Sequence, residues 1–196
     1  MLKYFILNKP YKVVSVFISA HRKKTTLGEI GIAFPPGTQA IGRLDENTEG
    51  LLILSTDKSL VEKILHPNQK IKKIYWVQVQ GEVSEESMNK LRDGILIRIE
   101  RKDYLTQPCE VTKMDTPTQI SPRIKHPVSD HIHTNWLEIT LTEGKFHQIR
   151  KMTAGIGHQT MRLIRVQIGN LKLEDLQTGH FREISEIELK KNLNLN

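Results

Sequence analysis

The chain has 196 residues, of which 38% are hydrophobic and 26% charged, a composition typical of a globular protein with one domain or two closely packed halves. Its formal net charge of +7 favours a polyanionic partner. No segment contains the ~18 apolar residues of a membrane helix, and the amino terminus lacks a signal-peptide pattern. One cysteine, Cys109, excludes an internal disulfide. We therefore expect a cytoplasmic protein without membrane association.

The first third of the chain alternates short apolar segments with turns. Strands rich in branched and aromatic residues are predicted over residues 2–8, 13–17 and 50–55. The last of these is continuously apolar, which indicates a strand buried on both faces. A short helix is expected near 26–30, and Asp57 is placed to cap a helix from residue 58 to about 65.

The remaining two thirds mix strands and helices without a regular order. Strands are predicted over 73–80, 95–99, 108–112, 136–142 and 162–168. Ser84 is expected to cap a helix that Gly94 ends, and further helices are expected over about 145–154 and after Ile184. Residues 113–134 lack periodicity and contain three prolines, which predicts a long loop. The pattern as a whole predicts an α+β fold with a largely antiparallel sheet.

The segment 42–50, with the sequence GRLDENTEG, directly precedes the buried strand. Loops held by rigid strands often carry active-site residues. Arg43 and Asp45 are two residues apart and would share one side of an extended segment, where the guanidinium favours an ionised carboxylate. Taken alone, the segment is more typical of a surface turn that contains an ion pair.

Two further segments carry side chains suited to a site. On the helix near residue 150, an apolar stripe would point inward, formed by Phe146, Ile149 and Met152. Arg150 borders this stripe, whereas Gln148 and Lys151 would point elsewhere. Tyr75, at the start of a predicted strand, offers a flat face for a base, although a tyrosine there is also compatible with a core position.

Cofactor and metal chemistry find little support in the sequence. There is no GxGxxG and no Walker A motif. The pair His131 and His133 has no third ligand at a recognisable spacing, so we predict no metal site. We interpret Cys109 as a buried structural thiol rather than a nucleophile.

Together, these segments resemble the RsuA/RluB/RluE/RluF family of bacterial ribosomal RNA pseudouridine synthases. The run GRLDENTEGLLILSTD is similar to the family's signature, EGKFHQIRKM to its second motif, KIYWVQV to the segment with the active-site tyrosine, and LNKPYKVVS to its opening KPxG motif. Their order and spacing agree over residues 5 to 170. Lys12 stands where that opening motif usually has its glycine.

The resemblance implies a pseudouridine synthase fold, with a largely antiparallel sheet through two halves that flank a central catalytic cleft. We expect this catalytic domain over 1–187, with a boundary between the halves near 62–70, and a frayed tail over 188–196. No residues are available for an S4-like domain, which suits the E-type branch that acts on large-subunit (23S) ribosomal RNA. The expected enzyme is a monomer that needs no cofactor.

The implied reaction cuts the N1–C1′ bond of a uridine, turns the uracil and rejoins it through C5. Asp45 is the expected nucleophile or base. Three routes stay open: attack at C1′, addition to the ring, or removal of the 2′-proton. The target nucleotide must leave the stack, at a cost of a few kcal/mol. By resemblance, Arg43 occupies the vacated space, Tyr75 packs on the uracil, Arg150 pairs with Asp45, and Ile149 forms part of the apolar wall.

The expected partner is ribosomal RNA of the large subunit or its precursor particle. Basic side chains would bind its phosphates, and the candidates are Lys12, Arg22, Lys23, Lys24, Lys70, Lys72, Lys73, Lys145 and Lys151. Two alternatives differ in substrate or class. One alternative substrate is transfer RNA, because the RluA and TruB families share the aspartate. A non-catalytic RNA-binding protein is the other, and Asp45, Tyr75 and Arg150 together argue against it.

Overall fold

The computed structural model describes residues 1–21, 23–66, 69–123 and 125–195. Its contacts divide the chain into two compact units. The first unit comprises Met1–Ile71 with Ile164–Asn196, and the second comprises Lys72–Leu163. Each unit combines helices with a sheet whose strand pairs are mainly antiparallel, which confirms the predicted α+β class.

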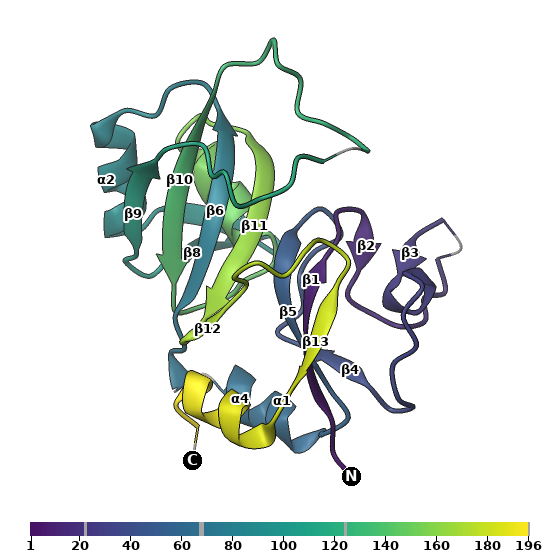
Figure 1. Cartoon of the computed structure of the whole chain (residues 1–196). Helices are drawn as coiled ribbons and strands as arrows, with labels where there is room; N and C mark the ends of the chain where they lie inside the picture. Colours follow the sequence, from purple (N-terminus) through teal and green to yellow (C-terminus); the bar gives the residue numbers. More distant parts are fainter. Residues whose placement is uncertain (22, 67–68, 124, 196) are drawn as a thin grey trace. The chain divides into compact units, whose positions relative to one another are not determined.

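In the first unit the strands are ordered β13-β1-β5-β11, with β4 also paired to β5 and β12 to β11 (Figure 1). Their bounds are β1 (Tyr4–Lys9), β4 (Gln39–Ile41), β5 (Glu49–Ser55), β11 (Thr160–Ile168), β12 (Leu171–Lys172) and β13 (Phe181–Ile184). Strands β5 and β11 are parallel. A separate parallel pair joins β2 (Val13–Val14) to β3 (Thr25–Thr26). The short 3-10 helix η1 (Leu27–Glu29) follows β3 directly in sequence.

Strand β5 is central, and all its residues are buried, which confirms the strand predicted from its continuous apolar run. Its side chains join a cluster with residues of β1, β2, η1 and the loop before β5, formed by Phe5, Leu7, Val13, Leu27, Leu44, Leu52 and Leu54. Helix α1 (Ser59–Leu65) follows, and Asp57 Oδ1 accepts a hydrogen bond from the Ser59 amide over 2.9 Å. The helix begins at Ser59 with Lys58 as its N-cap residue, one residue later than predicted, so Asp57 is not the N-cap, although its carboxylate binds the Ser59 amide.

The carboxyl-terminal residues pack more firmly than the expected frayed tail. Helix α4 (Glu186–Leu193) begins after Ser185, whose hydroxyl accepts from the Glu188 amide over 3.1 Å. Leu189 and Leu193 share one face of the helix and are buried. This apolar spacing holds residues 188–193 in place.

In the second unit the strands are ordered β11-β6-β10-β9 (Figure 1), and the unit also contains helices α2 and α3. Their bounds are β6 (Lys73–Gln80), α2 (Glu85–Asp93), β9 (Glu110–Met114), β10 (Thr134–Leu141) and α3 (Gln148–Gly155), with residues 160–163 of β11. A separate hairpin joins β7 (Leu96–Ile99) to β8 (Lys102–Leu105). In β6, Tyr75, Val77 and Val79 face the core, as the alternation predicts.

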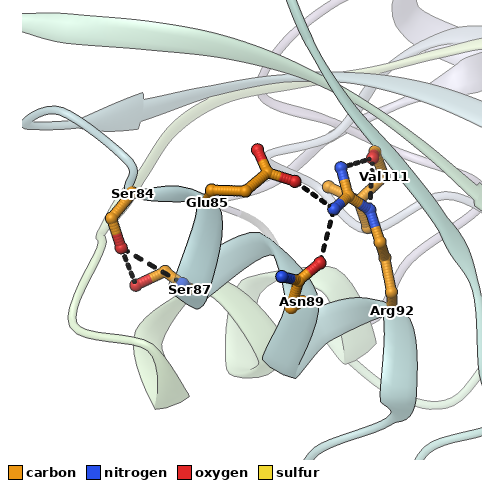
Figure 2. Close-up of polar contacts among 6 residues, drawn as sticks. All are labelled: Ser84, Glu85, Ser87, Asn89, Arg92 and Val111. Carbon is orange, nitrogen blue, oxygen red and sulfur yellow. Dashed lines mark hydrogen bonds and ion pairs between the residues drawn. The ribbon is translucent and has the colours of Figure 1, made fainter.

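Helix α2 is fastened to strand β9 by one arginine, as Figure 2 shows. Arg92 donates from Nε and Nη2 to the Val111 carbonyl oxygen over 2.9 and 2.7 Å. The same guanidinium donates to side chains one and two turns back, those of Asn89 and Glu85.

Ser84 caps helix α2 by accepting from the Ser87 amide over 3.1 Å, as predicted. The predicted end at Gly94 is also confirmed, where φ is 98° and a Cβ would lie 2.4 Å from the Thr106 carbonyl oxygen.

The predicted long loop connects β9 to β10. Two arginine contacts tie its middle to β11: Arg123 Nη2 donates to the Met161 carbonyl oxygen over 2.9 Å, and Arg162 Nη2 donates to that of Ser121 over 3.0 Å. The loop is therefore anchored within the second unit, although its described residues form no helix or strand.

Candidate active site

Asp45 lies in a short loop of the first unit, between β4 and β5. The loop turns on a hydrogen bond from the Thr48 amide to the Asp45 carbonyl oxygen, 3.0 Å long. Leu44 is buried in the core, whereas Asp45 is half-buried and Arg43 is exposed. The buried leucine therefore anchors the loop, and its two polar neighbours lie nearer the surface.

Segments distant in sequence hold this loop. The amide of Lys12 donates to the Glu46 carbonyl oxygen over 2.9 Å. On the other side, Arg165 donates from Nη2 to the Gly42 carbonyl oxygen over 2.7 Å and from Nε to that of Leu51 over 2.8 Å. Both ends of the Asp45 loop are thus fixed by backbone carbonyl contacts.

Gly50 closes the loop where β5 meets β11. Its φ is 100°, and a Cβ there would lie 2.3 Å from the Arg165 carbonyl oxygen. Such a distance is a steric clash with backbone, so only glycine fits. The need for glycine at this end of the loop therefore has a direct steric cause.

Lys12 stands at the glycine position of the opening motif and has a backbone conformation that favours glycine. Its φ is 63°, a left-handed conformation that favours glycine and carries strain in other residues. The side chain is exposed, and Nζ lies 5.4 Å from the centre of the Tyr11 ring. The turn therefore adopts a left-handed conformation at a residue other than glycine, and the side chain adds a positive charge to its surface.

Lys9 is a buried lysine that sequence reasoning missed. Its side chain is fully buried, and Nζ donates to the carbonyl oxygens of Pro10 and Val13 over 2.9 and 2.6 Å. Burial lowers the pKa of Lys9 to about 7, and the charges of Glu49 and Asp45 act in the opposite direction. The amine therefore holds the turn that contacts the Asp45 loop.

The other candidates belong to the second unit. Tyr75 is only 8% exposed and joins an apolar cluster that includes Ile149 and Met152. Its ring is therefore largely a core group, with one small exposed part. Ile149 is buried at the start of α3, as predicted for a residue of the inward stripe.

The start of α3 differs from the prediction at two residues. Phe146 is 62% exposed, because the helix begins only at Gln148 and the inward stripe does not extend back to it. Gln148 was expected to point away from the core but is buried. Its amide is satisfied there: Nε2 donates to Glu143 Oε1 over 2.5 Å, and Oε1 accepts from the Lys145 amide over 2.8 Å. A buried amide with such partners is well accommodated.

Glu143, the first residue of the second motif, organises this region. It also accepts from the Tyr104 hydroxyl and, over 3.0 Å, from the Gln107 amide. The hydrogen bond to Glu143 raises the pKa of Tyr104 to about 12. Sequence reasoning did not predict this contact, because it joins segments 39 positions apart.

Arg150 borders a surface hollow of about 430 Å³ in the second unit, lined also by Ala154, Gly157, Gln159 and Thr160. The arginine is half-buried, and Nη1 donates to the Thr160 carbonyl oxygen over 3.3 Å. One edge of its guanidinium is thus held by β11 beside an open space.

The predicted RNA-binding residues lie at or near the surface. The described members of this set are half-buried or exposed; they are Lys12, Lys23, Lys24, Lys70, Lys72, Lys73, Lys145 and Lys151. Some already have partners: Lys24 pairs with Glu46 at 3.1 Å and Lys72 with Glu110 at 2.7 Å. Arg22 lies outside the described residues.

The described parts of the chain hold neither a metal-binding cluster nor a reactive cysteine. Within them, no cluster of three or more His, Cys, Asp or Glu side chains could hold a metal ion. Burial raises the pKa of Cys109 to about 11, and its thiol donates to the Leu91 carbonyl oxygen over 3.1 Å. Such a thiol is a poor nucleophile. No helix of the described chain is long and apolar enough to span a membrane.

Comparisons with known proteins agree on one family. Residues 3–155 match the family described as RNA pseudouridylate synthase. The chain is 40% identical over 184 residues to ribosomal large subunit pseudouridine synthase E of Vibrio parahaemolyticus, covering 93% of this chain and 74% of that protein. The protein of the same name from Xanthomonas axonopodis pv. citri is 41% identical over 177 residues, with 87% and 88% covered. A solved structure described as a pseudouridylate synthase has a TM-score of 0.76 at 26% identity, covering 98% of this chain and 74% of its own.

Proposed function

Because the chain belongs to the RNA pseudouridylate synthase family, we propose that it isomerises one uridine of large-subunit ribosomal RNA to pseudouridine, with Asp45 as the catalytic carboxylate. Membership shows an RNA pseudouridine synthase. The choice of large-subunit RNA rests on relatives about 40% identical over most of the chain, whose names specify that substrate. The residue roles rest on the motifs and on the way the Asp45 loop is held.

The observation that most supports Asp45 is the fixation of its loop. The carboxylate is half-buried, while the surrounding backbone is bound by the amide of Lys12 and the guanidinium of Arg165. A catalytic group needs such pre-organisation, since a loosely held carboxylate would lose much of the benefit of proximity. An ordinary surface turn has no comparable reason to be fastened at both ends.

The remaining roles follow the motifs. Tyr75 and Arg150 act with Asp45 as catalytic residues, Tyr75 by packing on the flipped uracil. Arg43 and Ile149 bind the substrate. For Arg150, we expect Arg150→Lys to retain part of the turnover that Arg150→Met loses, because lysine keeps the charge without the planar fork. Equal losses in single-turnover assays would argue against an electrostatic role.

The aspartate is tested by Asp45→Asn. The amide keeps the size of the side chain but removes its charge and basicity, so turnover should be abolished while RNA binding stays nearly intact. Glu46→Gln is the matched control, since it neutralises the next residue in the same loop and should retain activity. Residual turnover of Asp45→Asn within about tenfold of wild type, roughly 1.4 kcal/mol of barrier, would reject the assignment.

The substrate is tested by mapping pseudouridines in ribosomal and transfer RNA from cells with and without the protein. We expect one site in large-subunit RNA to disappear and to return with wild-type protein but not with Asp45→Asn. Loss of a transfer RNA site would instead support the alternative substrate. The proposed enzyme is a monomer, which sedimentation of the purified protein can check.

A further inference from the structure

Phe146 has an unusual setting for a large apolar side chain. It is 62% exposed and stacks on His147, with ring centroids 4.0 Å apart and ring planes 21° apart. Exposing an aromatic ring to water forgoes the stabilisation that its burial would give. The stacked pair stands immediately before helix α3, which carries Ile149 and Arg150.

Two lysines accompany these rings. Lys151 Nζ lies 5.4 Å from the centre of the Phe146 ring and also donates to the Arg98 carbonyl oxygen over 2.8 Å. Lys145 Nζ lies 5.0 Å from the centre of the Tyr104 ring. The surface therefore alternates aromatic rings with ammonium groups, which is the composition of single-stranded nucleic-acid binding sites.

The backbone beneath the rings is held in place. The buried side chain of Gln148 binds the Lys145 amide on one side and the Glu143 carboxylate on the other. His147 adopts φ 55°, a conformation that costs free energy in a residue other than glycine. The segment is thus pre-organised, so that little further ordering is needed when a flat ligand binds.

We propose that Phe146 and His147 form a stacking platform for an unpaired base of the substrate RNA, with Lys145 and Lys151 binding the adjacent phosphates. The inference rests on the proposed function. The base is a neighbour of the target uridine rather than the uridine itself, because Asp45 and Tyr75 are the groups assigned to the target. One face of the Phe146 ring stacks on His147 and Lys151 Nζ lies over the ring at 5.4 Å, so a base reaches the ring as Lys151 turns from it to the adjacent phosphate.

The test measures binding of unmodified large-subunit ribosomal RNA, transcribed in vitro, by wild type, Phe146→Ala, Phe146→Leu and Phe146→Trp. Stacking on an aromatic ring predicts that alanine weakens the affinity by about 5-fold to 100-fold. Leucine should weaken it similarly, because it is apolar but cannot stack, whereas tryptophan should retain the wild-type affinity. Leu96→Ala is the matched control, since Leu96 is aliphatic and equally exposed at 62%. The RNA affinity of Leu96→Ala should equal that of wild type.

The outcomes separate this inference from the proposed function. If wild type forms pseudouridine but Phe146→Ala binds as tightly, or if leucine binds as tightly as phenylalanine, the platform is overturned and the proposed function stands. If Phe146→Ala loses affinity but wild type forms no pseudouridine in any RNA, the platform stands and the proposed function fails. Unchanged thermal unfolding midpoints of the variants exclude a folding defect, as expected for an exposed side chain.

Discussion

Ser15 and Leu44, which are 29 residues apart, exchange two hydrogen bonds. The Ser15 hydroxyl donates to the Leu44 carbonyl oxygen over 2.7 Å and accepts from the Leu44 amide over 3.1 Å. Both residues are buried. One small side chain therefore satisfies both backbone groups of the residue that immediately precedes Asp45.

Ser15→Ala should lower both stability and turnover. It leaves a buried amide and a buried carbonyl oxygen without this partner, at a cost of about 1–3 kcal/mol for an unsatisfied group. The freed loop should also hold Asp45 less well, so single-turnover rates should fall while RNA affinity changes little. Ser19→Ala is the control, since its hydroxyl bonds an exposed amide. Equal behaviour of the two variants in thermal unfolding and turnover would contradict the prediction.

Tyr75 should be probed by Tyr75→Phe and Tyr75→Leu. The side chain is almost buried, so alanine would leave a cavity costing about 3–5 kcal/mol and obscure the effect on RNA. Phenylalanine keeps the ring and should keep RNA affinity, whereas leucine should weaken it about 5-fold or more if the ring packs on a base. Equal affinities of the two variants would exclude stacking. A fall in turnover with phenylalanine alone would assign a chemical role to the hydroxyl.

Lys9 predicts a pH dependence of the free energy of unfolding. Burial lowers its pKa to about 7 in the folded protein, from 10.5. Between these values the unfolded chain binds more protons, so stability should rise with pH, by at most ~1.4 kcal/mol per pH unit. The destabilisation that comes from burying the charged lysine is complete below about pH 7 and is relieved as pH rises towards 10.5.

The measurement compares wild type with Lys9→Met in urea between pH 7 and 9. Taking the difference between the two proteins cancels groups that both share, including Cys109, whose pKa is raised to about 11. The gain in stability with pH should be smaller in Lys9→Met. Parallel pH profiles would mean that the lysine titrates at its ordinary pKa despite its burial.

The basic cluster Arg22, Lys23 and Lys24 should contribute to RNA binding through phosphate contacts. Each contact adds about 0.7–0.9 to the slope of log affinity against log salt, so replacing all three with alanine should flatten it by roughly two to three units. The single-turnover rate at saturating enzyme should stay nearly unchanged. Lys190→Ala with Lys191→Ala, on α4, serves as the control. Parallel salt titrations of equal affinity would place the RNA path elsewhere.

Local patterns sufficed wherever one short segment carried its own physical signal. The start of α2 follows from the Ser84 side chain, which accepts a backbone amide, and the alternation of β6 follows from the two-residue period of a strand. Strand β7 matches the strand predicted over 95–99, but its hairpin partner β8 was not predicted. The turn residues of this hairpin, Glu100 and Arg101, have φ of 47° and 68°, a conformation usually marked by asparagine or glycine.

By itself, the sequence determined the family from four motifs in a fixed order, the α+β class from the mixed pattern of strands and helices, and the loop that carries Asp45 from one contiguous motif. Only the tertiary structure decided which polar groups are buried and which apolar ring is exposed. Lys9 and Gln148 are buried because backbone and carboxylate partners satisfy them, and Phe146 is exposed because its helix starts two residues later. Such outcomes depend on the partners that folding brings to each side chain, and no periodicity in the chain records them.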